Sequence, residues 1–493
     1  MKKLLLFVII PFFLSAMQKV EAQELRKLTL DDVIRLSETQ SPNALMAIHR
    51  FRASYWQYRT YVAQYRPSLT LSGSTPDYTT AYTRVWNSVI GDYQYVSTNI
   101  LQTIGSLSLT QNIGFTGGTV SLQSDLTLEN NFEDNSNRYI TAPISVRFVQ
   151  PLFRYNSLKW ERKIEPLRYE AAKKTYLSSI EQVHAQAVQQ FFSLALAQIN
   201  VQIAEMNFHN ADTLWRMSQG RYNLGTIAED EMLEMQLSWL NTGIARKEAE
   251  MNLRDREIRL RSFLGFNEQV RLELIIPSEI PNLQVDPQEV LELAHANNPE
   301  LLQQQLTLLN AQSSLAQAKA DKGLNANLTA SFGLRDQDPV FRNAYSESNQ
   351  QQTVRIGITL PILDWGLGRG RYQMAKSSLE LTQVTSEQDR RDFDQNLILD
   401  AEQFNLQAEQ VATAAKSDTV AQKMFEVAYQ RFMIGKISVL ELNNADTKKD
   451  QNRRAYVQAL QTYWNYYYNI RSLALFDFVN RKQLGTDYDV LLD

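Results

Sequence analysis

The sequence predicts a mainly α-helical protein with a transmembrane β-barrel portion, built from two tandem copies of one unit. Three observations carry this prediction. The chain has 493 residues, which is too long for a single compact core. Blocks of sequence recur in the same order at fixed offsets. Each copy joins a stretch of alternating apolar and polar residues to a very long helical stretch.

Residues 1–22 have the features of a secretory signal peptide. Two lysines precede an apolar run from Leu4 to Leu14, and Ala22 ends the segment. The run is too short to span a bilayer, which disfavours an N-terminal membrane anchor. No later segment has the ~18 consecutive apolar residues of a transmembrane helix. We therefore expect an exported chain that is either soluble or a β-type membrane protein.

The composition excludes several classes of function. The formal net charge is −4, so no basic surplus indicates a nucleic-acid partner. The chain has no cysteine, which excludes disulfides and a lipid on an N-terminal cysteine. No nucleophile elbow or phosphate-binding loop is present. The histidines are scattered rather than spaced as metal ligands: His49, His184, His209 and His295. We expect no enzyme activity, no metal and no cofactor.

Two recurring segments establish the duplication. One recurs at an offset of 257 residues, which aligns Pro42 with Pro299. Another recurs at an offset of 210, which aligns Pro151 with Pro361. The difference, 257 − 210 = 47, means that the first copy holds 47 extra residues between its two prolines. Chance similarity between helical sequences is the alternative, and the shared order of the segments disfavours it.

The alternating segments predict strands with one apolar face. In the second copy, Leu328, Ala330 and Phe332 alternate with small or polar residues, and the first copy has similar stretches within 68–150. A sheet with one face in solvent is the alternative to a membrane barrel. The export signal and the long helices favour the barrel. The extra residues include GGTVSLQSDLTLEN, which predicts an added β-hairpin, in the barrel or as an external flap.

The helical stretches are unusually long and end in the same short turn. Between Arg371 and Gly435 there is neither proline nor glycine, so the stretch can reach on the order of 100 Å. Apolar residues recur at spacings of three and four, which indicates coiled-coil packing. The same spacing assigns the aromatic stretch 463–468 to packing between helices. Gly225 aligns with Gly435, and glycine favours the left-handed conformation that ends a helix. Each turn is therefore interpreted as the tip of a helical hairpin.

The chain resembles the TolC family of outer-membrane efflux and export proteins over essentially its whole length after the signal. Ser41-Pro42 and Asn298-Pro299 are each followed by a leucine three residues after the proline. QPLF and LPILDWG stand at strand-to-helix junctions, where Tyr155 and Trp365 suggest membrane-interface anchors. The turns QGRYNLGTIAEDEML and YQRFMIGKISVLELNNA are similar to the family's tip segments.

The resemblance implies a homotrimer in the outer membrane, in contact with its lipid and with a long periplasmic extension. Each chain would give four strands to a shared 12-strand β-barrel, and the hairpins would form a periplasmic α-barrel. The implied function is a passive exit duct of a tripartite efflux or type I secretion system, gated at its periplasmic tip. The implied partners are a periplasmic adaptor protein and an inner-membrane pump of the RND or ABC type. The sequence does not identify the cargo.

The resemblance also assigns roles at the tips. Glu441 matches an acid of the family's entrance ring, whereas Asn444 departs from the acidic pattern. Glu234 takes the equivalent place in the first copy, and Glu231 lies beside it. In a three-fold assembly one acid per chain makes a ring of like charge; favourable charge at a helix N-terminus is the alternative. The expected adaptor-docking residues are Leu224, Gly225, Thr226, Ile434, Gly435 and Lys436. Arg221 and Arg431 either bridge neighbouring hairpins or are solvated.

These patterns divide the chain into nine segments. In order they are the signal peptide 1–22, helices 23–67, strands 68–151 with the extra hairpin, a helical hairpin 152–265 with its tip near 225, a linker 266–285, helices 286–323, strands 324–361, a helical hairpin 362–476 with its tip near 435, and a tail 477–493. Two other classes of protein stay possible from the sequence. One is a soluble periplasmic coiled-coil adaptor of the membrane-fusion type, and the other is a secreted structural or adhesive coiled coil.

Overall fold

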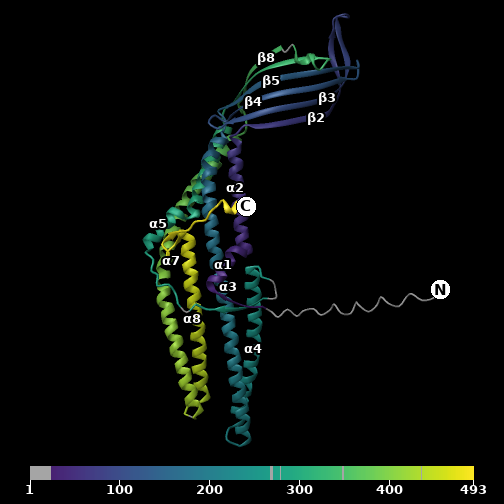
Figure 1. Ribbon diagram of the computed structural model, residues 1–493. Helices are drawn as coiled ribbons and strands as arrows, with labels where there is room; N and C mark the ends of the chain where they lie inside the picture. Colours follow the sequence, from purple (N-terminus) through teal and green to yellow (C-terminus); the bar gives the residue numbers. More distant parts are fainter. Residues whose placement is uncertain (1–23, 267–269, 278, 347–348, 435, 493) are drawn as a thin grey trace, which may run out of the picture. The chain divides into compact units, whose positions relative to one another are not determined.

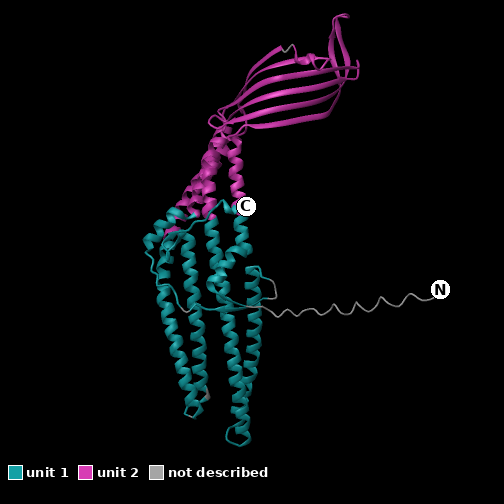
Figure 2. Cartoon of the chain, in the orientation of Figure 1, with its two compact units in different colours: residues 1–49, 176–298, 395–491 teal, residues 50–175, 299–394, 492–493 magenta. Residues whose placement is uncertain are grey.

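The chain folds into two compact units, each assembled from separate stretches of sequence. The computed structural model describes residues 24–266, 270–277, 279–346, 349–434 and 436–492, so the signal peptide at 1–22 lies outside the described residues. Unit 1 comprises residues 1–49, 176–298 and 395–491. Unit 2 comprises residues 50–175, 299–394 and 492–493 (Figure 2).

The elements follow one another in the same order in the two halves of the chain (Figure 1). The first half contains β1 (Glu24–Thr29), α1 (Leu30–Gln40), α2 (Pro42–Gln64), β2 (Ser68–Asn87), β3 (Asp92–Ile113), β4 (Gly118–Asn131), β5 (Ser136–Leu152), α3 (Ser157–Asn223) and α4 (Glu229–Leu264). The second half contains β6 (Val270–Ile275), α5 (Pro287–Asn297), α6 (Pro299–Asp321), β7 (Asn325–Asp338), η1 (Asn343–Tyr345), β8 (Asn349–Thr359), α7 (Leu367–Met433), α8 (Val439–Ala474), β9 (Phe476–Asp477), β10 (Lys482–Gln483) and η2 (Val490–Leu492).

Corresponding helices of the two copies have equal lengths. α1 and α5 have 11 residues each, and α2 and α6 have 23. α3 and α7 have 67 residues each, and α4 and α8 have 36. The tandem repeat expected from the sequence is thereby confirmed. At 1.5 Å per residue, each 67-residue helix is about 100 Å long.

Local sequence signals set the starts of the short helices. The Thr29 side chain accepts from the backbone of Asp32, while Asp32 accepts from the backbone of Thr29, which makes a capping box for α1. The Ser41 side chain accepts from the backbone N–H of Ala44 in the first turn of α2. α2, α5 and α6 all begin with proline, which is suited to a first turn because no N–H is needed there.

Unit 1 contains a single layer of four helices in the order α4, α3, α8, α7. Phe208 of α3 stacks on Trp239 of α4, with 6.5 Å between ring centroids. Between α3 and α8, Arg454 donates to Asn200 at 2.7 Å. Between α8 and α7, Arg453 donates to Asp418 at 3.0 Å. These contacts link neighbouring helices of the layer, and α4 and α7 form its two flanks (Figure 1).

A buried ion-pair network joins helices within unit 1. Arg471 of α8 donates through two nitrogens to the Glu181 carboxylate of α3, both at 3.0 Å, and also to Asp477 at 3.2 Å. His184 lies between two carboxylates: its Nδ1 is 3.5 Å from Glu181 and its Nε2 is 3.7 Å from Glu38 of α1. Burial lowers the pKa of His184, but the two carboxylates outweigh burial and raise that pKa above its usual value.

The aromatic stretch 463–468 packs between helices, as its spacing predicts. Tyr463, Tyr467 and Tyr468 are buried, and the Tyr463 ring lies 5.3 Å from that of Phe404 on α7. The Tyr463 hydroxyl donates to the Pro281 carbonyl at 2.9 Å. This stretch therefore belongs to the core of unit 1.

Unit 2 contains one antiparallel sheet of six strands in the order β2-β3-β4-β5-β7-β8. The resemblance implied four strands per chain, and the sheet holds six. The first copy supplies β2 to β5 and the second supplies β7 and β8, so the added hairpin of the first copy is part of the same sheet (Figure 1). Three register shifts interrupt the pairing, which adds local twist.

Two short pairings have no counterpart among the predicted elements. β1 pairs in parallel with β6, which lies in the segment 266–285 between the two copies. β9 pairs with β10 in the C-terminal tail. Among the described helices, none is both long and apolar enough to cross a membrane.

The His184 site predicts a pH dependence of stability. Because its pKa is raised in the folded state, the stabilisation by His184 is complete below the unfolded value of about 6.5 and is lost as pH rises through the folded value. We expect the difference in melting temperature between the natural protein and His184→Gln to shrink from pH 6 to pH 9. His209→Gln, at an exposed position of α3, is the control and should show no such trend. A difference that stays constant with pH would contradict the prediction.

Candidate functional site

The first hairpin tip closes α3 with a hydrogen-bonded glycine turn. Gly225 has φ +70°, and its N–H donates to the Tyr222 carbonyl at 2.8 Å. The Thr226 N–H donates to the Arg221 carbonyl at 2.9 Å, and the Thr226 hydroxyl reaches the same carbonyl at 2.9 Å. These two backbone bonds form a Schellman motif, which satisfies carbonyls that the helix end leaves unpaired. The left-handed φ explains the glycine.

The second tip repeats the long bond of this motif. The Lys436 N–H donates to the Arg431 carbonyl at 2.9 Å, at positions equivalent to Thr226 and Arg221. Gly435 lies outside the described residues. Both tips expose an apolar side chain at equivalent positions, Leu224 with 79% and Ile434 with 66% of its surface accessible. Each tip therefore presents an exposed apolar side chain immediately before the position of its glycine.

The acidic residues proposed from sequence are exposed near the N-termini of α4 and α8. Glu231 lies in the first turn of α4, and Glu234 follows one turn later. Glu441 forms a capping box with Ser438: its carboxylate accepts from the Ser438 N–H at 2.9 Å, and its own N–H donates to the Ser438 hydroxyl at 3.3 Å. The structure thus gives Glu441 a helix-capping role while leaving the side chain exposed to solvent.

The two tip arginines contribute to the turns through their backbone. Arg221 and Arg431 lie in the last turns of α3 and α7, and both are exposed. Their carbonyls accept the bonds that close the turns. Any residue type can supply that carbonyl, so the turn geometry does not explain why arginine occurs at both positions.

A polar cluster between the two hairpins escaped the sequence analysis. Asn207 of α3 donates to Asp450 of α8 at 3.0 Å, and Asp450 is buried. Lys449 lies 2.5 Å from Asp446 and 3.5 Å from Asp450. Burial raises the pKa of Asp446, although Lys449 opposes the rise. The sequence does contain a run of charged residues along one side of α8. The same pattern occurs on helix surfaces that face solvent, so the neighbouring helices must be known before the cluster can be recognised.

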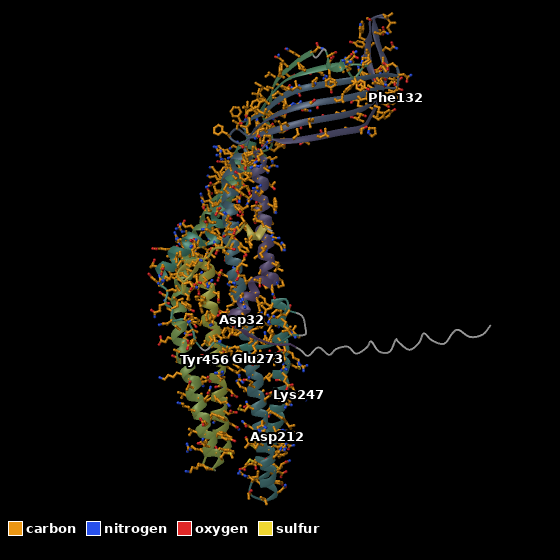
Figure 3. The ribbon with its side chains drawn as sticks, in the orientation of Figure 1. Asp32, Phe132, Asp212, Lys247, Glu273 and Tyr456 are labelled. Carbon is orange, nitrogen blue, oxygen red and sulfur yellow. The ribbon has the colours of Figure 1, made fainter. Side chains whose placement is uncertain are left out.

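The two flanks of the helical layer carry uncovered apolar stripes. On α4 the stripe repeats at spacings of four and three, and Lys247 (Figure 3) and Arg254 fill its two remaining positions. Its apolar members are Leu233, Leu237, Leu240, Ile244, Met251 and Ile258, all at least 49% accessible. On α7 the stripe points away from α8 and comprises Leu399, Leu406, Val420 and Val427, with 54–57% accessible. Such regular spacing is typical of a seam between helices.

The sheet of unit 2 separates apolar and polar side chains. We call its apolar face the apolar band: Leu69 and Leu71 (β2), Leu107 and Leu109 (β3), Val120 and Leu122 (β4), Val146 and Phe148 (β5), Ala330 and Phe332 (β7) and Val354 (β8). On the other face one cross-strand row takes a polar residue from every strand: Ser68, Thr110, Ser121, Arg147, Ser331 and Thr353. Two opposed faces of this kind are typical of a membrane barrel with a wet interior.

The two expected interface anchors differ in environment. Trp365 has 90% of its surface accessible and follows the end of β8. Tyr155 is instead held within unit 2, where its hydroxyl lies 2.5 Å from the Ser313 hydroxyl of α6. Within the described part of the chain, no group of three or more His, Asp or Glu side chains is placed to hold a metal ion.

Comparisons with known proteins give one consistent result. The model of the outer membrane efflux protein family matches residues 33–266 and 290–474. The fold is similar to the CmeC outer membrane channel of Campylobacter jejuni, with TM-score 0.64, 14% identity and coverage of 94% of this chain and 88% of that one. It is also similar to the outer membrane protein VceC of Vibrio cholerae, with TM-score 0.61, 12% identity and coverage of 90% and 95%. No curated protein sequence matches.

The tip geometry predicts opposite effects of two glycine substitutions. A Cβ at Gly220 or Gly225 meets nothing within 4 Å, so only the backbone conformation distinguishes the two sites. Gly225→Ala forces alanine into a left-handed conformation and should destabilise the tip by ~1 kcal/mol. Gly220→Ala, within α3, should stabilise the helix end by ~0.5–1 kcal/mol.

Hydrogen exchange of the segment 220–232, followed by mass spectrometry, measures both effects locally. Exchange should become faster in Gly225→Ala and slower in Gly220→Ala. The same change in both variants would exclude the Schellman turn as the cause.

Proposed function

The chain belongs to the outer membrane efflux protein family, and we propose that it forms the exit duct of a tripartite export system, passing cargo from the periplasm to the exterior. The protein is an outer-membrane channel protein with a periplasmic extension, and the family match covers both copies of the repeat. The comparisons do not favour the soluble adaptor considered from sequence. The fold and family are those of channels rather than of enzymes.

The observation that carries this proposal is the helical layer of unit 1. A layer one helix thick leaves its two flanks, on α4 and α7, with apolar stripes that have no partner within the described chain. A closed ring of copies, α4 of one against α7 of the next, covers both stripes and encloses a tunnel. We propose that the ring is a homotrimer.

The entrance of the tunnel is proposed to lie at the hairpin tips. With three copies, Glu441 contributes three carboxylates, and Glu234 and Glu231 add further negative charge. The free part of the Glu441 carboxylate stays exposed while the capping bonds with Ser438 hold its position. Its capping role and a role in a charged ring are therefore compatible. Such a ring favours cations over anions at the entrance.

The tips are also the proposed docking points for a periplasmic adaptor, which would link the duct to an inner-membrane pump. The proposal rests on the exposed Leu224 and Ile434, which lie at equivalent positions of two hydrogen-bonded turns. In the first turn Leu224 is followed by Gly225 and Thr226. In the sequence of the second tip, Ile434 is followed by Gly435 and Lys436. Arg221 and Arg431 are exposed beside them and are available for charged contacts with a partner.

The uncovered stripes predict that assembly fails when one of them is charged. Leu237→Asp on α4, or Val420→Asp on α7, should place a charge in the seam and release monomers, because burying an unpaired charge costs several kcal/mol. Ala245→Asp, at an exposed position of α4 outside the stripe, is the control and should leave the assembly intact. Native mass spectrometry in detergent counts the copies. Intact trimers in both stripe variants would contradict the proposed seam.

The entrance ring predicts a change in ion selectivity. In planar bilayers we expect the natural protein to form cation-preferring channels, and Glu441→Lys to lower that preference more than Glu441→Gln does. Ser438→Ala removes the capping partner but keeps the charge, so it should reduce helix stability by ~1 kcal/mol without changing the reversal potential. Equal reversal potentials in the natural and Glu441→Lys channels would reject the ring. A purified protein without channel activity would reject the duct itself.

A further inference from the structure

The added hairpin of the first copy lies inside the sheet, between the strands that correspond to those of the second copy. β2 begins at Ser68 and β7 at Asn325, which differ by 257 residues, the offset between the two opening segments. β5 contains Pro151, and Pro361 follows β8 at the offset of 210. β2 and β5 are therefore the counterparts of β7 and β8, and the hairpin β3–β4 is the addition.

We infer that β3 and β4 are wall strands of the barrel, so that three copies close a barrel of eighteen strands instead of twelve. The inference rests on the proposed function, because it takes the trimer as its premise. Such a barrel has a wider exit than a barrel built from four strands per chain. The partner on each free edge of the sheet is a second copy of this chain.

Pairing along the full strands places the hairpin in the wall. β3 pairs with β2 from Ser68↔Thr110 to Asn87↔Asp92, and β4 pairs with β5 from Thr119↔Val149 to Asn131↔Ser136. The apolar band continues across both added strands, since Leu109 and Leu122 stand in one row between Leu69 and Val146. An external flap has no need for apolar side chains in register with a lipid-facing band.

Aromatic residues extend the same face of β2 and β3. Tyr93 and Tyr95 alternate in phase with Leu107 and Leu109 on β3, and both are exposed. Their neighbours on β2 are also exposed. The ring centroids of Tyr78 on β2 and Phe132, which follows β4, lie 6.4 Å apart. Phe132 is labelled in Figure 3. On this face of β3 the residues between Tyr95 and Leu107 are small or polar apart from Leu101. Exposed aromatic residues near the end of a wall strand are typical of the girdle where a membrane barrel meets water.

The free edges have the directions that closure requires. β2 and β8 leave one side of their backbone unpaired within the sheet. The strands alternate in direction and their number is even, so β8 of one copy meets β2 of the next in antiparallel orientation. Unpaired backbone cannot face lipid, so the edges must be covered. At ~4.8 Å between strands and a tilt of ~40°, the backbone diameter is about 36 Å for eighteen strands and about 24 Å for twelve.

The absence of natural cysteine allows a disulfide test of the edge pairing in the full-length protein. Thr70→Cys on the polar face of β2 is combined in turn with Thr353→Cys, Arg355→Cys and Gly357→Cys on the polar face of β8. At least one of these pairs should link neighbouring chains and give a covalent ladder that ends at three. Val354→Cys and Ile356→Cys face the apolar side and serve as controls that should not link to Thr70→Cys. A ladder ending at two, or no link from the polar face, overturns the inference.

Electron microscopy of end-on views measures the width. Deleting residues 88–134 removes 47 residues, the length by which the two copies differ, and joins β2 directly to β5. The barrel diameter should fall from about 36 Å to about 24 Å, by the one third expected for twelve strands. Equal diameters in both proteins would place the hairpin outside the wall. If the deletion variant does not assemble, a diameter near 24 Å in the natural protein overturns the inference on its own. In either case, channel activity is measured on the natural protein. If the channel is active, only the eighteen-strand barrel is overturned; if it is inactive, the proposed duct is overturned.

Discussion

A helical layer one helix thick cannot cover the outer flanks of its own end helices, and the rest of the structure depends on this constraint. The four long helices of unit 1 satisfy one another only along the contacts α4–α3, α3–α8 and α8–α7. The exposed stripes of α4 and α7 are covered by helices of neighbouring copies in the proposed ring. The sheet of unit 2 meets the same constraint through hydrogen bonds, because within the described sheet β2 and β8 are each paired along one edge only. In the proposed function, neighbouring copies cover both the stripes and the sheet edges, and the closed ring that they form is the duct.

The duplication explains how one chain supplies both matched helical hairpins and a sheet whose edges have suitable directions. Helices of equal length in the two copies keep the two hairpins matched along the layer. The bonds from Arg471 to Glu181, and from Asn207 to Asp450, join α3 of one hairpin to α8 of the other at two separate levels. The one large difference between the two copies is the added hairpin β3–β4. A hairpin adds two strands, so strand direction still alternates across the sheet. A single added strand would have set two edges in the wrong orientation for antiparallel closure.

The tips combine two uses of the same side chains. Glu441 secures the start of α8 through Ser438 and remains exposed, so a residue that stabilises the turn also places charge at the end of the hairpin. Leu224 and Ile434 are held on hydrogen-bonded turns, which lowers the conformational entropy lost in the proposed docking of an adaptor. The left-handed backbone explains the glycine at the first tip, whereas nothing in the turn geometry explains the arginines.

Much of this architecture could be predicted from local sequence. The long helices followed from the absence of glycine and proline, the tips from Gly225 and its repeat, and the strands from their alternation, because each of these signals depends on neighbours in the chain. The family followed from the same segments. What the sequence left undecided depends on contacts between distant residues. Three features depend on a partner 90 or more residues away: the parallel pair β1–β6, the contact of Tyr155 with Ser313 and the buried setting of His184. The membership of β3 and β4 in the main sheet depends on which strand edges meet, and alternation alone does not predict that. The sequence by itself determined the repeating helix-and-strand unit and its class, because periodicity and turn chemistry are local; only the tertiary structure decided how many strands share the sheet and which polar groups are buried, because register and burial are set by packing.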